Sequence, residues 1–133
     1  MAPLEDTTEG TLVIDGTFPL GGLLDVPMVV TIKKGKVVSV EDHPRKQELE
    51  DLFEKYGTQA RNIAEFGVGT LPSAKMSGNT LEDEKVKGTI HIAFGDNASM
   101  GGTVKVPIHL DGIVKKPSVW LDDVLWMKDG NVV

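Results

Sequence analysis

The sequence contains no cysteine, which excludes disulfide bonds, thiolate metal ligands and cysteine nucleophiles. It has no basic cluster either: 14 lysines and arginines stand against 20 aspartates and glutamates, a net charge of −6 that argues against a nucleic-acid partner. No apolar run approaches membrane-spanning length, and no signal peptide is recognisable. We therefore expect a cytoplasmic protein that binds neither membranes nor nucleic acid.

The overall composition is typical of a globular protein, and we expect one domain over residues 1–133. A hydrophobic content of 40% suits a chain with a real core, and 15 glycines with 7 prolines indicate many turns and short strands. We expect the α+β class: a β-rich domain whose sheet is mixed or antiparallel, with about eight strands, one main helix and a short second helix.

Two local patterns in the first half predict particular elements. Residues 28–33 and 36–41 are β-branched runs on either side of Lys34-Gly35, which predicts a β-hairpin. Residues 44–56 predict the main helix, with Asp42 as a possible cap. Its apolar residues share one stripe, which predicts packing against the core. The stripe consists of Leu49, Leu52, Phe53 and Tyr56.

Two histidines and a carboxylate occupy two short strand-like segments, residues 88–94 and 107–111. Side chains alternate between the faces of a strand, so His109 and Asp111 point the same way. If the strands lie side by side, His91 converges with them. That is the ligand set of a zinc hydrolase or of a two-histidine, one-carboxylate iron site. The alternative is that each histidine is a structural residue satisfied by ordinary hydrogen bonds.

Two other segments could contribute to the same site. Residues 62–70 predict a strand from which Glu65 projects a carboxylate, and residues 95–102 predict a flexible loop suited to lining a site.

Two further features lie outside this site. Residues 80–86 predict the short second helix, capped by its first residue. His43, at a strand-to-helix corner, is expected to be solvated and to have no metal partners.

Four ordered blocks stand out in the second half of the chain: Ala64–Thr70, Gly78–Val86, Gly88–Ala93 and Ile108–Asp111. Together they resemble the thermophilic aminopeptidase family (aminopeptidase T and S type). The similarity extends over nearly the whole chain and is densest between residues 62 and 111. Four blocks in one order are more specific than any one of them.

The resemblance implies a metallopeptidase that acts on a peptide N-terminus and forms a homo-oligomer. Paired zinc, cobalt or manganese ions would activate water in its C-terminal domain. The ligands carried over are Glu65, His91, His109 and Asp111; catalytic residues stay unassigned. The family's other glutamate would lie upstream of Met1, and Ala98 replaces a tyrosine of well-known members. We therefore expect a truncated form, lacking the N-terminal domain, with weak or no hydrolase activity alone.

Two alternatives remain open. A related fold occurs in 2,5-dihydroxypyridine dioxygenase, where a similar histidine, histidine and aspartate set holds a single iron. That set, here His91, His109 and Asp111, is more complete in this sequence than the two-metal set. The other alternative is a non-enzymatic assembly domain that associates through strand edges or exposed apolar surface.

Overall fold

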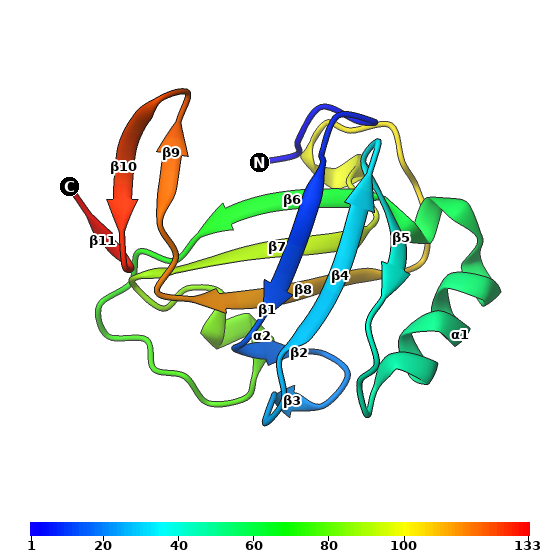
Figure 1. Cartoon of the computed structure of the whole chain (residues 1–133), viewed down its shortest axis with the longest axis horizontal. Helices are drawn as coiled ribbons and strands as arrows, with labels where there is room; N and C mark the ends of the chain where they lie inside the picture. The colour runs from blue at the N-terminus through cyan, green and yellow to red at the C-terminus, as the bar shows by residue number, and fades with distance from the viewer.

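The computed structural model describes all residues from 1 to 133, and it has the β-rich α+β architecture that the sequence predicts (Figure 1). Its two helices are α1 (Lys46–Tyr56) and α2 (Thr80–Asp83). Two 3₁₀ turns lie at Thr58–Arg61, directly after α1, and at Ala98–Met100. The strands are β1 (Gly10–Ile14), β2 (Thr17–Phe18), β3 (Gly22–Leu23), β4 (Met28–Lys33), β5 (Lys36–Val40), β6 (Ile63–Val68), β7 (Thr89–Gly95), β8 (His109–Lys115), β9 (Val119–Leu121), β10 (Val124–Lys128) and β11 (Asn131–Val132).

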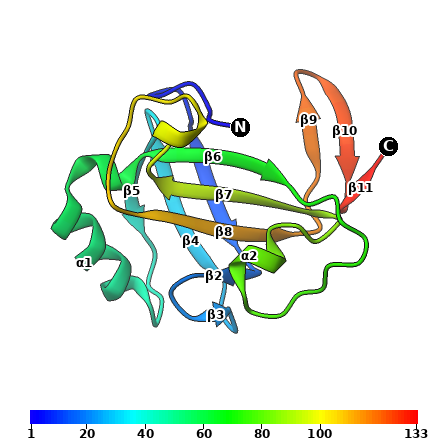
Figure 2. The same cartoon turned by 180° about the vertical axis from the view of Figure 1, so that it is seen from behind.

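Two three-stranded antiparallel sheets, β1-β4-β5 and β6-β7-β8, form the body of the molecule. Figures 1 and 2 show β1 and β4 running steeply across β6, β7 and β8, so that the sheets pack face to face with crossed strands. The core of 15 buried residues draws on both sheets and on α1. Phe94 of β7 lies at its centre, with ring centroids 6.0 Å from Phe18 and 6.1 Å from Phe53. Burying one face of β6-β7-β8 leaves its other face for a site.

The predicted hairpin is confirmed as β4 and β5. Lys34 and Gly35 both have positive φ, 49° and 74°, as a tight hairpin turn of the primed type requires. At Gly35 a side chain would also meet the backbone of Asp6, since an added Cβ would lie 2.7 Å from its nitrogen. Local turn chemistry was therefore a sound guide here.

The main helix is confirmed, but its start and its cap were wrong. It begins at Lys46 rather than at residue 44, and Asp42 does not cap it. The N-cap is Arg45, which has no side-chain cap bond; instead the Arg45 backbone N–H donates to Nδ1 of His43 at 2.9 Å. The turn also satisfies the first N–H of the helix, since Lys46 N–H donates to the His43 carbonyl at 3.0 Å.

The second helix is shorter than predicted. α2 ends at Asp83, and the residues up to Val86 continue in turns with i→i−3 bonds, because Val86 pairs with Leu71 in an isolated parallel bridge. Its cap is Asn79, whose side chain accepts from the Leu81 N–H at 3.0 Å, and not Thr80. Neither difference affects the main sheet.

The remaining strands are small. Eleven were found where about eight were expected, since β2, β3 and β11 have two residues each, too few to show an alternating pattern. β9, β10 and β11 form a C-terminal ribbon that stands off the body (Figure 1, orange to red). None of the helices has the length and apolar character needed to traverse a bilayer.

Candidate metal centre

The three strands of the central sheet each contribute to one cluster on a single face. Glu65 lies on β6, His91 on β7, and His109 and Asp111 on β8. Ala93 is the residue between them: it pairs with Glu65 on one side and with Asp111 on the other. Paired residues of neighbouring strands point to the same face, so both carboxylates flank a residue whose side chain is only a methyl group.

A β-bulge decides which face Glu65 joins. Ile63 pairs with Phe94, yet Glu65 pairs with Ala93, so Ala64 is an extra residue in β6. Without it, Glu65 would stand opposite Ile92 and point into the core, because a one-residue change of register exchanges the two faces of a strand. Bulges re-aim side chains in this way beside functional sites.

The side chains converge as the alternation of the strands predicted. Glu65 lies between the two imidazoles: Oε1 is 3.3 Å from Nε2 of His91, and Oε2 is 3.0 Å from Nε2 of His109. Nε2 of His109 is also 3.3 Å from Oδ2 of Asp111. Donor atoms of Glu65, His91 and Asp111 lie within 4.8 Å of one another. The strands thus bring the four predicted side chains together, whereas their role as metal ligands stays a prediction.

His109 is held from both sides of its ring. Its Nδ1 lies 2.8 Å from the backbone carbonyl of Asp96, to which it donates, so Nε2 is directed at the carboxylates. The hydrogen bond to Asp111 raises the pKa of His109 to about 9, helped by the Asp96 carbonyl and the negative charges of Asp111 and Glu65 and opposed by burial. Nε2 therefore carries a proton at neutral pH unless a stronger cation replaces it.

The unpaired atoms of the cluster fit a divalent metal ion. Nδ1 of His91 and Oδ1 of Asp111 are buried and have no hydrogen-bond partner, a costly state for polar atoms. The ion pairs of Glu65 and Asp111 are made with histidines, not with lysine or arginine. Two imidazoles and two carboxylates with spare acceptor capacity suit a divalent metal cation.

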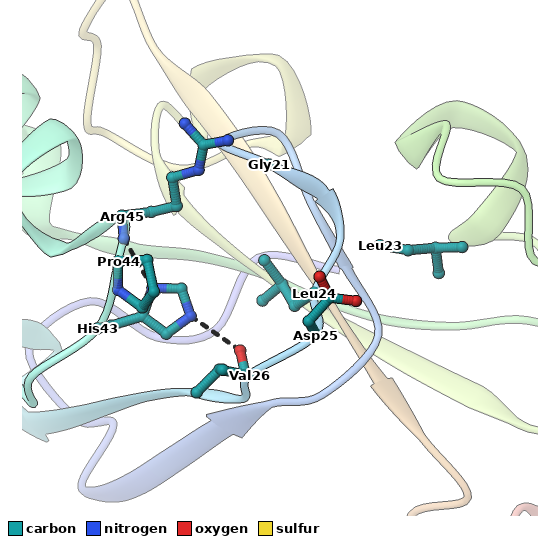
Figure 3. A pocket seen from close by; sticks show the side chains of 8 residues that line it. All are labelled: Gly21, Leu23, Leu24, Asp25, Val26, His43, Pro44 and Arg45. Carbon is teal, nitrogen blue, oxygen red and sulfur yellow. Dashed lines mark hydrogen bonds between the residues drawn. The ribbon is translucent and has the colours of Figure 1, made fainter.

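His43 lies in a different place (Figure 3). Its Nε2 donates to the carbonyl of Val26 at 2.8 Å, and its Nδ1 accepts from the backbone of Arg45. The ring lines a surface cavity of about 190 Å³ that also includes Asp25. The expected contact with solvent is present in part, since His43 is half-exposed, but both ring nitrogens are bound to backbone groups, which gives His43 a structural role.

Two contributors to the site were missed in the sequence. Asp96 acts through its backbone carbonyl, which no side-chain pattern reveals. Gly67 stands opposite His91 in the β6–β7 ladder. A signal for it existed, because a glycine inside a strand often marks a close approach.

Comparison with known proteins decides the family. The family model described as "2,5-dihydroxypyridine 5,6-dioxygenase" (NicX) matches residues 1–133. The chain belongs to this family. It is 26% identical over 144 residues to a 2,5-dihydroxypyridine 5,6-dioxygenase of Pseudomonas putida, covering 98% of this chain and 41% of the relative. The solved structure of the P. putida 2,5-dihydroxypyridine dioxygenase superposes with a TM-score of 0.87 at 26% identity, over 99% of this chain.

The chain spans about two fifths of the length of these relatives: 41% of the curated protein and 42% of the solved structure. The four residues of the cluster all lie on β6, β7 and β8 of this chain.

The resemblance to the aminopeptidases led to the wrong family. The family match, the relative and the solved structure all point to the dioxygenase instead, so the aminopeptidase, metallopeptidase, hydrolase and zinc assignments are wrong. Three of the four blocks that carried the resemblance lie on the central sheet and the fourth contains α2, and such features of a fold do not determine a function. The alternative reading, which rested on His91, His109 and Asp111, was the better guide.

Proposed function

We propose that this chain carries the metal centre of an iron-dependent dioxygenase that acts on a dihydroxylated pyridine ring. The observation that supports it most is a cluster in which donor atoms of Glu65, His91 and Asp111 lie within 4.8 Å of one another, in a chain of the 2,5-dihydroxypyridine 5,6-dioxygenase family. His109 contacts both carboxylates of this cluster, and two buried atoms of the cluster have no hydrogen-bond partner. The proposed ligands are Glu65, His91, His109 and Asp111.

The donor set favours this chemistry. Two histidines and a carboxylate with open positions are the usual ligands of non-haem Fe(II) oxygenases, and bound Fe(II) would supply the electrons for oxygen activation. Two carboxylates balance the double charge of the ion in a site where His91 is only 8% exposed. The imidazoles and carboxylates of this sheet are redox-inactive, so they could not activate oxygen without the metal.

The residues around His109 determine where its ring nitrogens carry protons. Its bond to the Asp96 carbonyl keeps a proton on Nδ1, which leaves Nε2 as the donor atom. Since the pKa of His109 is raised to about 9, a metal must displace the Nε2 proton at neutral pH. Glu65 Oε2, 3.0 Å away, is well placed to accept that proton or to take the metal itself.

Anaerobic reconstitution with Fe(II) tests the proposal. We expect one iron per chain by elemental analysis, and oxygen uptake on addition of 2,5-dihydroxypyridine. The Asp111→Ala variant should lose the iron, whereas His43→Gln should keep it, because His43 lies in the separate cavity of Figure 3. Failure of the wild-type chain to bind iron would refute the assignment of the metal centre.

Binding and turnover are measured separately, since the chain spans two fifths of its relatives' length. Iron binding without oxygen uptake would support the metal centre and refute turnover by this chain alone. The homo-oligomer predicted from the sequence stays a prediction, which light scattering checks.

A further inference from the structure

Gly67 occupies the position in β6 directly opposite His91 of β7. It is two residues beyond Glu65 on the same strand and therefore shares its face. A Cβ built at Gly67 would lie 2.0 Å from Nε2 of His91, 2.2 Å from Cε1 and 2.8 Å from Cδ2. The imidazole thus occupies the space that any side chain at position 67 would need.

The backbone does not demand glycine at this position. Gly67 is not among the residues with positive φ, so an alanine could adopt its conformation without strain. Glycine inside a strand weakens the strand, because it has no side chain to pack and loses more entropy on folding. The approach of the His91 ring is the structural reason for glycine here.

We propose that Gly67 is a positioning residue of the metal centre: it lets the His91 imidazole lie against β6, where Nε2 reaches Glu65. This inference rests on the proposed function for its metal. Nε2 is both the ring atom nearest to the missing Cβ and the atom 3.3 Å from Oε1 of Glu65. A methyl group at position 67 must therefore displace the ring atom that meets Glu65, and the imidazole moves with it.

The structure also indicates how the protein would respond. The atoms in conflict are at the far end of a side chain that can rotate, not in the backbone. Gly67→Ala should therefore fold, with His91 turned away from Glu65. The expected damage is local: a displaced imidazole and weak metal binding in an intact sheet.

The first measurement is metal affinity, by anaerobic titration with Fe(II) and with Co(II) as a spectroscopic substitute. We expect Gly67→Ala to bind roughly 10–100-fold more weakly than wild type, the range found for groups that orient metal ligands. Val68→Ala is the matched control, since the neighbouring side chain points to the opposite face. Wild-type affinity in Gly67→Ala would overturn the proposal, as would an equal loss in Val68→Ala.

The second measurement separates this inference from the metal assignment. In metal-free protein, the NMR resonances of the His91 ring should shift in Gly67→Ala relative to wild type. The melting temperature of the variant should also be lower than that of wild type. In a His91→Ala background the same substitution should be neutral or stabilising, because the ring that it meets is gone. Equal effects in both backgrounds would overturn the proposal.

Two further results also decide the proposal: a Gly67→Ala variant that does not fold, and a wild-type protein that binds no metal. If Gly67→Ala does not fold but Gly67→Ala/His91→Ala does, the conflict with the ring is supported; if neither folds, the cause lies elsewhere and the proposal is wrong. If wild type binds no metal, the proposed function fails, while the coupling between positions 67 and 91 still decides whether Gly67 positions His91.

Discussion

The molecule holds its histidines in two contrasting settings. His43 binds two backbone groups, Val26 O and Arg45 N, so its ring completes a turn before α1. His91 and His109 instead meet the carboxylates of Glu65 and Asp111, and buried atoms of that cluster remain unpaired. The comparison teaches that the setting of a histidine, and not its presence alone, makes it a candidate metal ligand: His91 and His109 lie beside carboxylates in a cluster with unpaired buried atoms, and His43 does not.

The largest expected effect is that of removing an imidazole from the cluster. His109→Ala should lower the affinity for Fe(II) by more than about 100-fold, beyond the range for residues that only orient ligands. The fold should persist, because the side chain of His109 is partly exposed whereas its neighbour Leu110 packs in the core. Anaerobic metal titration and circular dichroism measure the two effects. If His109→Ala still bound iron as wild type does, His109 would not be a metal ligand, and it would not differ from His43 in this respect.

The next effect concerns the charge beside His109. Asp111→Asn removes the strongest cause of the raised pKa of His109, so that pKa should fall from about 9 toward its ordinary value. The ring protons of His109 can be followed by NMR between pH 5 and pH 10 in metal-free protein. An unchanged titration midpoint would show that Asp111 does not control His109.

The same pKa predicts how stability depends on pH in metal-free protein. Because the folded-state pKa of His109 is above its ordinary value near 6.5, its contribution to stability is complete below that value. The contribution is lost as the pH rises through about 9. Thermal melts from pH 6 to pH 10 should therefore show a decline in wild type that is smaller in His109→Gln. Parallel curves for the two proteins would contradict the prediction.

The smallest effect is expected at the other histidine. His43→Ala removes the bonds to Val26 and Arg45, which should lower the free energy of unfolding by about 1 kcal/mol. Metal affinity should not change, since the ring lies in its own cavity. Chemical denaturation and metal titration check both statements. A loss of iron binding here would mean that the two settings are coupled.

The misidentified family has a physical explanation. Strand blocks, glycine turns and a histidine pattern describe a sheet and its loops, and proteins of related fold have such features in common. The set His91, His109 and Asp111 was complete in the sequence, whereas the two-metal set lacked a glutamate. Weighing the ligand set above the extent of the resemblance would have favoured the dioxygenase family that the comparisons identify.

Local chemistry by itself determined much of this protein. A positive-φ turn at Lys34-Gly35 makes the hairpin, an apolar stripe buries Leu49 and Phe53 of α1, and a period of two puts His109 and Asp111 on one face. Each depends on neighbours a few residues away, so each can be read along the chain.

Tertiary structure decided how the site is assembled, because the contacts of Glu65 and of the Asp96 carbonyl depend on which strands pair and in what register. Glu65 meets His91 and His109 across 26 and 44 residues of sequence, and only the bulge at Ala64 turns it to their face. The Asp96 carbonyl that orients His109 belongs to the backbone, which carries no residue-specific signal. Register and backbone contacts follow from long-range packing, and no spacing within a single strand encodes them.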